Sequence, residues 1–353
     1  MAEILGLTVS DFPFLRMKPD NMPWVLHGNL AWGWRDKPHL RDSANWPQPM
    51  RDEWGSDQDQ GRTAGARAQQ SQIQQFRKLR TALDEFKPDV MLFLYRDSAE
   101  TFSGEERPQF WIHSHEAVKV TPYNLWTFFR GNYFEEDPDR VDLFRGHPDA
   151  ALHLADRLQK AGIVPRVVPA PIHPNGLGHN AIATAVHLDW DKQKYATPII
   201  PLGIDPFRLG RTRNEEGLSP WDKKRSDTPL TPRQAFDLGR EIARAYRDSP
   251  WRVAIVAGVD WSHANDSGVE LERIHPDVEA DQRRFAQWQA GDFTHWGDNW
   301  SFDEMETHAQ WELLVTIVLA GAMSELHSKI QHAHFQPNWV CNDNFVTTIF
   351  KPS

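Results

Sequence analysis

Short, uninterrupted apolar runs alternate along the chain with segments in which apolar residues recur at the spacing of a helix face. The runs predict buried strands at 4–9, 90–94, 164–169, 197–202 and 253–257, and a last strand at 339–350. The helical spacing predicts helices at 69–86, 147–161, 232–246 and 302–330. Strands that are apolar throughout are covered on both sides. The alternation therefore predicts an α/β fold with a central mixed, mostly parallel sheet and helices on both faces.

One segment departs from this alternation. The residues at about 17–66 are rich in Trp, Pro, Asp and Gly, which favour turns and interrupt regular elements. We therefore expect an irregular, partly helical excursion there. The 353 residues contain no visible internal repeat, so we expect 1–353 to form a single large domain.

The composition argues against several classes of protein. Hydrophobic residues make up 40% and charged residues 25%, as in globular proteins, and a net charge of −10 disfavours nucleic acid as the main partner. We expect no membrane span and no signal peptide, because neither pattern is present. The single cysteine, Cys341, excludes a disulfide framework and a thiolate-rich metal site within one chain. We therefore expect a cytoplasmic protein.

Polar residues follow the predicted strands directly, at the edge where open α/β sheets bind their ligands. We expect these segments to gather around one cleft. The residues at these positions are Ser10, Asp11, Arg96, Asp97, Ser98, Asp260, Ser262 and His263, with His173 and His179 in the loop after 164–169.

Two of these histidines suit proton transfer. His263 follows a strand within a polar cluster, where an imidazole can act as acid or base near pH 7; the alternative is a histidine bonded into a loop. His179 is accompanied by Gly176 and Gly178, which permit close approach of the backbone to a ligand. The alternative for that segment is a loop whose glycines cap a helix.

Two carboxylates and a pair of histidines are further candidates. Glu312 begins an apolar helical run, where a carboxylate needs a cation, a metal or hydrogen-bond donors, or else meets a helix dipole. Asp11 suits a metal ligand, a substrate-binding acid or a turn residue before Pro13. His113 and His115 would share one side of a strand and could chelate a metal, but we favour two imidazoles on a solvated face.

Motifs of other enzyme classes are missing from the sequence. It contains no Walker loop, no GxGxxG after a strand and no GxSxG string, which disfavours nucleotide-binding folds and nucleophile-elbow hydrolases. The chain has 16 Trp, which suit an aromatic pocket, although core packing is their commoner role. Its 16 His favour metal or proton chemistry.

Five strings in this order resemble the class III extradiol ring-cleaving dioxygenases, specifically the catalytic subunit of the protocatechuate 4,5-dioxygenase type. They are ILGLTVSDFPFL, KPDVMLFLYRDSAETF, HPNGLGHNAIATAVHLDWD with TPIIPLGIDPF, RVAIVAGVDWSHA and HAQWELLVTIVLAGAM. The resemblance implies Fe(II) held by two His and one Glu, with open positions for a catechol and O2. By position, Glu312 matches the ligand Glu, His263 the acid–base His, and His179 the His of the substrate loop.

The two ligand histidines of the family do not carry over, because Asp11 and Ser98 stand at their positions. Asp11, Ser98 and Glu312 would suit Mg²⁺, Mn²⁺ or Ca²⁺ better than Fe(II). Without a metal, Asp11 and Glu312 would repel, and one should be protonated unless a basic group such as Arg96 lies between them. Iron could instead be held by other residues, for example His113, His115 or His179.

Three functions follow from these residues. We favour a dioxygenase-like oxidoreductase that acts on a phenolic, catecholic or heteroaromatic ring with a rebuilt metal site and O2. The alternatives are a metal-free acid–base enzyme (a hydrolase or lyase) on an aromatic substrate, and a non-catalytic subunit that partners an active paralogue. The resemblance implies a homodimer or such a hetero-oligomer. We expect the substrate to contact Arg96, Asp97, Ser98 and Ser262.

Overall fold

The computed structural model describes residues 2–21, 23–32, 37–97, 100–102, 108–124, 134–194, 196–206, 229–264 and 273–353. The strands are β1 (Ile4–Val9), β2 (Val90–Arg96), β3 (Phe110–His113), β4 (Ala117–Val120), β5 (Asp142–Arg145), β6 (Arg166–Val168), β7 (Ile199–Ile204), β8 (Val253–Gly258), β9 (Asp260–His263), β10 (Ile330–Gln336) and β11 (Asp343–Phe350). The α-helices are α1 (Pro23–Trp32), α2 (Gln48–Trp54), α3 (Arg62–Phe86), α5 (Pro148–Lys160), α6 (His179–Leu188), α7 (Pro232–Arg247), α8 (Val278–Ala290), α9 (Phe302–Thr307) and α10 (Leu313–Glu325).

The strands form one large mixed sheet in the order β10-β11-β1-β8-β2-β7-β3-β6, with β9 paired to β11. Its centre is parallel: β8 lies between β1 and β2, and β2 also pairs with β7. Antiparallel pairs flank this centre, because β11 joins β1 on one side and β3 joins β7 on the other. The sheet and its helices confirm the predicted α/β fold, and the parallel centre brings the carboxyl ends of β1, β2 and β8 to one edge.

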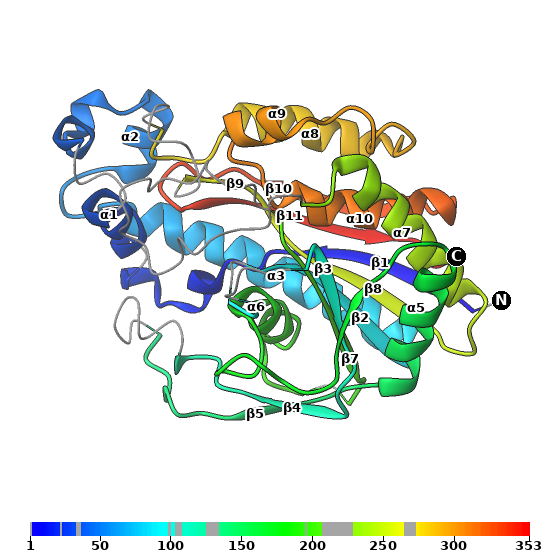
Figure 1. Ribbon diagram of the computed structural model, residues 1–353. Coiled ribbons are helices and arrows are strands. Elements are labelled where there is room, and N and C mark those ends of the chain that lie inside the picture. Colours follow the sequence, from blue (N-terminus) through cyan, green and yellow to red (C-terminus); the bar gives the residue numbers. More distant parts are fainter. Residues whose placement is uncertain are drawn as a thin grey trace.

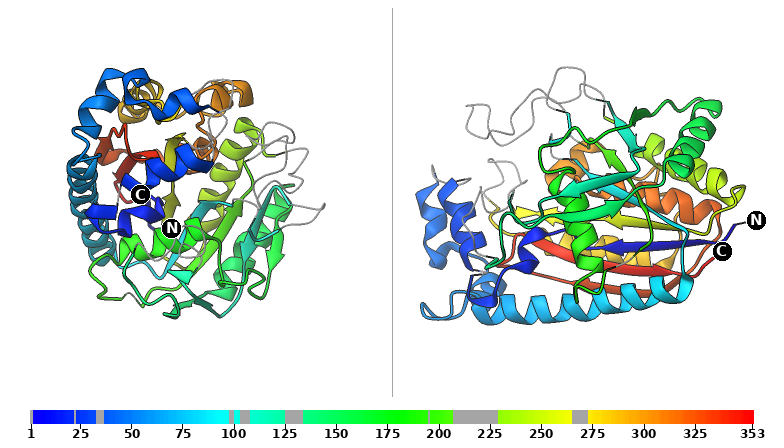
Figure 2. Two further views of the ribbon diagram at one scale, coloured as in Figure 1. Left: turned by 90° about the vertical axis from the view of Figure 1, so that its left-hand side faces the viewer. Right: turned by 90° about the horizontal axis from the view of Figure 1, so that it is seen from below.

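Helices cover both faces of the sheet (Figure 1). On one face α5, α7 and α10 enclose one apolar cluster, and on the other α3 and α6 enclose a second. In Figure 2 (right) α3 runs along β1 and β11. Helix α10 (LLVTIVLAGAMSE) is apolar around most of its circumference and is buried from Leu313 to Met323, as expected for a helix packed on all sides.

The prediction of one continuous C-terminal helix at 302–330 is wrong. Helix α9 ends at Thr307, α10 begins at Leu313, and the chain is in β10 from Ile330. The break occurs at Ala309, whose φ of 52° is left-handed and ends the helical path. A backbone conformation of this kind in a buried alanine has no signature in the apolar pattern.

The other predicted elements are present, with shifts at their ends. Helix α3 starts at Arg62, before the predicted 69–86, and α7 begins after Thr231, whose side chain forms a capping box with Gln234. The segment 17–66 is irregular and partly helical, as expected, with α1, α2 and three 3₁₀ turns at Pro19–Asn21, Pro38–Arg41 and Ser43–Asn45.

Tryptophans serve mainly as packing residues in the described ranges. Trp46 and Trp54 pack edge to face within the 17–66 segment, and Trp288 of α8 packs in the same way with Trp296. Trp111 is buried on β3. None of the helices in those ranges combines the length and apolar character that a bilayer span requires.

We predict that Gly239→Ala destabilises the fold. A Cβ on Gly239 would lie 1.8 Å from the Val318 carbonyl oxygen, so α7 and α10 must separate. Overpacking of this kind costs about 1–3 kcal/mol, which outweighs the better helix propensity of alanine. Urea denaturation measures the change in the free energy of unfolding. Asp237→Ala, on the exposed side of α7, is the control and should change it by less than ~1 kcal/mol. Equal stability of Gly239→Ala and the unaltered protein would contradict the close packing.

Candidate functional site

A cluster of charged side chains occupies the carboxyl edge of the parallel strands. Asp11 follows β1, Arg96 ends β2, and Asp260 and His263 lie on β9 just beyond β8. Glu312 reaches the same place as the N-cap residue of α10. All five side chains are buried. The structure therefore brings together four of the predicted site residues, as the rule for open α/β sheets requires.

The Glu312 carboxylate is the centre of this cluster. Its Oε1 lies 2.6 Å from Arg96 Nε and 3.1 Å from His263 Nε2, and its Oε2 accepts a hydrogen bond of 2.6 Å from the backbone N–H of Asp260. Burial alone would raise the pKa of Glu312, but Arg96 and His263 outweigh it and lower the pKa. Glu312 is therefore an ionised carboxylate whose two oxygens both contact protein donors.

His263 is held between two carboxylates. Its Nδ1 is paired with Asp343 Oδ1, while Nε2 faces Glu312. Residues 263 and 343 are direct neighbours across the antiparallel β9–β11 pair, and the His263 backbone N–H donates to the Ala309 carbonyl at 3.0 Å. Burial disfavours the imidazolium, but Asp343 and Glu312 raise the pKa of His263 well above its usual value. His263 is thus protonated near neutral pH and suits the role of a proton donor.

Asp11 has a higher pKa than Glu312. Burial, assisted by the charge of Glu312, raises the pKa of Asp11 to about 7. Its Oδ2 accepts a 2.7 Å hydrogen bond from Asn180 Nδ2, whereas its buried Oδ1 has no hydrogen-bond partner among the described residues. Arg96 is paired with Glu312, so Glu312 is the ionised carboxylate of the two, while Asp11 takes up and releases its proton near neutral pH.

Asp260 is a second buried acid beside Asp11. Its Oδ2 accepts a 2.9 Å hydrogen bond from the Ser10 hydroxyl. Burial and the charge of Asp11 raise the pKa of Asp260 well above its usual value. The cluster therefore combines ionised and protonated carboxyl groups, an arrangement that accompanies acid–base chemistry.

His179 is the first residue of α6, and its surroundings support a charged imidazole. Its Nδ1 is paired with Glu100 Oε1, and its backbone N–H donates to Glu100 Oε2 at 2.8 Å. Although burial opposes the charge, Glu100 raises the pKa of His179. Gly178 packs closely on this carboxylate, since a Cβ there would lie 3.1 Å from Glu100 Oε2. Gly176 adopts a φ of 85° against the Lys119 carbonyl, so both glycines serve contacts within the chain.

The remaining residues predicted to contact substrate either bond other protein groups or lie outside the described residues. Asp97 accepts a 2.8 Å hydrogen bond from the Glu100 backbone N–H and others from Thr101. The Ser262 hydroxyl donates to Asp281 Oδ2 at 2.6 Å. Ser98 lies outside the described residues. Substrate binding by these three residues stays a prediction.

The solvated face favoured for His113 and His115 is wrong. Both side chains are buried, their ring centroids are 5.3 Å apart, and Tyr95 Oη lies 3.2 Å from His113 Nε2. Burial lowers the pKa of His113 to about 3 and also lowers that of His115. Both imidazoles are therefore neutral.

The donor set around Glu312 does not fit Fe(II). A facial iron site needs a carboxylate and two neutral imidazoles with lone pairs free for the metal. Here Glu312 Oε2 accepts from the Asp260 backbone, Oε1 lies 2.6 Å from the Arg96 guanidinium, and the imidazole that faces Oε1 is paired with Asp343 through Nδ1. Within the ranges that the structure covers, no three His, Cys, Asp or Glu side chains are grouped as a metal site.

Comparisons with known proteins add little. No protein-family model and no curated protein matches the chain. Among solved structures, the chain is similar to the uncharacterized protein JW3007 from Escherichia coli K12, with 12% sequence identity and a TM-score of 0.44. The match covers 78% of this chain and 91% of that one. A likeness at this level says nothing about chemistry, so the function has to be argued from the site.

Several important residues were missed by sequence reasoning. Asp343 and Asn180, which hold His263 and Asp11, lie within a strand and a helix that carry no motif for them. Glu100 lies in RDSAETF, one of the quoted strings, and its position just after a strand was a usable signal. Asp281 gave no signal, because acidic residues in the first turns of helices are common.

We predict that Glu312→Gln destabilises the protein strongly. The substitution leaves the buried Arg96 and His263 without their shared anion, and breaking a buried pair costs about 3–5 kcal/mol. Glu325→Gln is the matched control: Glu325 lies at the other end of α10 in partly exposed pairs with Arg240 and Arg244, and its loss should cost roughly 1 kcal/mol or less. Urea denaturation compares the two variants. A similar loss of unfolding free energy in both variants would show that the buried ion pairs of Glu312 matter no more for stability than the partly exposed pairs of Glu325.

We further predict that the protein is stable without a divalent metal. Because Arg96 and His263 already neutralise Glu312, EDTA should leave Tm unchanged, and added Fe(II), Mn²⁺ or Mg²⁺ should not raise it. Elemental analysis of the purified chain should find far less than one metal per chain. Stoichiometric iron, with a fall in Tm on chelation, would contradict this prediction.

Proposed function

We propose that this protein is a metal-independent acid–base enzyme that acts on a small phenolic or heteroaromatic molecule. The observation that supports this most is the position of His263 between Asp343 and Glu312, with Arg96 on the same Glu312 oxygen. A buried imidazole oriented by a carboxylate at Nδ1 is the usual arrangement of a histidine that transfers protons.

The protonation states suggest how the roles are divided. His263 carries a proton near neutral pH and can donate it to the atom that receives an electron pair. Asp11, with its pKa near 7 and an Oδ1 that lacks a hydrogen-bond partner among the described residues, suits the removal of a proton. Proton donor and acceptor at one activated ring would support decarboxylation, C–C lysis or hydrolysis. None of these reactions requires O2.

The substrate class follows from the family resemblance and from the aromatic residues beside the cluster. Phe12, directly after Asp11, lies with its ring centroid 5.8 Å from that of Phe345 and 5.2 Å from that of Phe14. Phe12 and Phe345 are both buried, so the protein beside Asp11 is apolar, which suits an aromatic ligand better than a charged one. A cytoplasmic location remains part of this proposal, since the single Cys341 suits a reducing compartment. The family resemblance adds a dimer, or an oligomer with a paralogue, to the proposal.

The test is a panel of catechols, hydroxybenzoates and hydroxypyridine carboxylates incubated with the protein in D2O. Proton NMR follows ring-proton exchange and product formation, and an oxygen electrode follows O2. We expect turnover of at least one class without O2 consumption and without sensitivity to EDTA. His263→Gln should lower the rate by about 10²–10⁴-fold, the usual contribution of a general acid or base.

His153→Gln is the control for loss of a histidine. His153 on α5 bonds the Ala245 carbonyl at 3.0 Å, away from the cluster, and its loss should leave the rate unchanged. Ring opening with stoichiometric O2 uptake would replace our proposal with the dioxygenase. Activity that appears only with a co-purifying paralogue would favour the non-catalytic subunit.

A further inference from the structure

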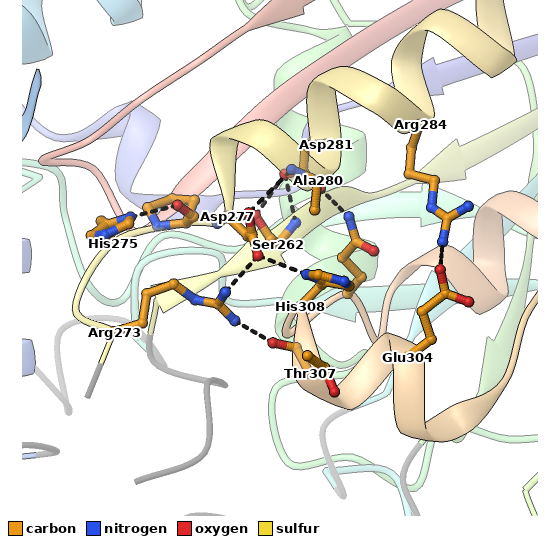
Figure 3. Close-up of polar contacts among 12 residues, drawn as sticks. Ser262, Arg273, His275, Asp277, Ala280, Asp281, Arg284, Glu304, Thr307 and His308 are labelled. Atoms are coloured by element: carbon orange, nitrogen blue, oxygen red, sulfur yellow. Dashed lines mark hydrogen bonds and ion pairs between the residues drawn. The ribbon is translucent and has the colours of Figure 1, made fainter. Parts of the chain in front are cut away.

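The N-terminal end of α8 carries a polar network that contacts β9 (Figure 3). Its centre is Asp281, whose side chain is fully buried. Oδ2 accepts hydrogen bonds from the Ser262 hydroxyl at 2.6 Å, the Ser262 backbone N–H at 3.1 Å and Asn344 Nδ2 at 2.7 Å. Oδ1 accepts from Gln310 Nε2. We call these four residues the Asp281 bracket.

Each donor in the bracket is close in sequence to His263 or to one of the two carboxylates that contact it. Ser262 precedes His263, Asn344 follows Asp343, and Gln310 stands two residues before Glu312. One carboxylate therefore connects β9, β11 and the segment that leads into α10. These are the three segments whose relative positions determine how His263 meets its two anions.

We propose that Asp281 is a positioning residue, which fixes His263 between Asp343 and Glu312 by connecting the three segments that carry them. This inference rests on the proposed function only in naming His263 as the proton donor. Asp281 bonds the neighbours of these residues, so it acts through them rather than on a substrate.

The geometry explains why an acceptor with two oxygens is suited to this position. The donors around Asp281 come from separate segments, and its pKa, which burial raises to about 6, still leaves an ionised carboxylate as the acceptor at neutral pH. A positional shift of about 1 Å in a catalytic group can cost about 100-fold in rate. A single buried group that connects all three segments limits such shifts, whereas separate pairs would allow each segment to move alone.

The same network contains contacts that do not reach the cluster. Asp277 caps α8 by accepting from the Ala280 backbone N–H at 3.1 Å, and it also bonds Arg273 and His308. Arg284 on α8 is paired with Glu304 on α9 (Figure 3). Glu304→Gln therefore weakens the docking of α8 without touching the bracket, and it is the matched control.

Asp281→Asn separates geometry from charge. Its one remaining oxygen could accept from Ser262 and Asn344, and its new amide N–H₂ would face Gln310. The buried Oε1 of Gln310 has no hydrogen-bond partner in the part of the chain described here, so a flip of that amide would let it accept. We therefore expect Asp281→Asn to keep the three segments together, while Asp281→Ala releases them.

The experiment measures the imidazole of His263 by NMR titration in full-length protein, with His263→Gln used to assign the signal. In Asp281→Ala the pKa of His263 should fall toward its ordinary value, and exchange of a responsive panel phenol in D2O should slow about 100-fold, mainly in kcat. Asp281→Asn and Glu304→Gln should preserve both. If Asp281→Ala does not fold, Gln310→Ala removes one donor and should shift both quantities in the same direction by less.

The outcomes separate this inference from the proposed function. A His263 titration unchanged in Asp281→Ala, or in Gln310→Ala where the former does not fold, would overturn the positioning role whatever the activity. A lowered pKa of His263, in a protein for which no panel compound reacts, would support the positioning role while the proposed function fails. A loss in Asp281→Asn equal to that in Asp281→Ala would show that the charge, not the bracket, matters.

Discussion

The buried carboxylate of Glu312 is the constraint on which the rest of this site depends. An anion removed from water is stable only if charged or hydrogen-bonded partners surround it, and Arg96, His263 and the Asp260 backbone provide them. These partners come from β2 and β9, while Glu312 starts α10. A single electrostatic requirement thereby fixes how the apolar helix α10 is placed against the edge of the parallel strands, independently of any ligand.

The same requirement determines the protonation of the neighbouring acids. Burial raises the pKa values of Asp11 and Asp260, and the negative charges of their neighbours, Glu312 among them, raise these values further. His263 gains from both Asp343 and Glu312 and keeps its proton. Buried ion pairs contribute little net stability, but they fix geometry. In the function that we propose, this cluster holds His263 as the proton donor beside Asp11, which exchanges its proton near neutral pH.

The fold and part of the site could be predicted from the sequence because both depend on local patterns. Apolar runs located the central strands, and the residues that follow them included Asp11, Arg96 and His263. The carboxyl ends of parallel strands must meet, so convergence was foreseeable. Asp343 was not, since it reaches His263 only through the β9–β11 register. The prediction of a helix through Ala309 was wrong for a related reason. Ala309 has a left-handed backbone, and the next residue, Gln310, bonds Asp281. The spacing of apolar residues carries no information about a tertiary contact of this kind.

The charges around Glu312 also bear on whether a metal ion could bind there. A metal ion in such a site supplies positive charge to a carboxylate, and neutral imidazoles complete its shell. In this chain Arg96 and His263 supply positive charge at Glu312. A guanidinium beside a metal ion would be repelled by it, whereas a buried glutamate without any cation would be unstable, so the Arg96–Glu312 pair takes the place that a metal would need. The charges at Glu312 therefore agree with the metal-independent proton transfer that we propose.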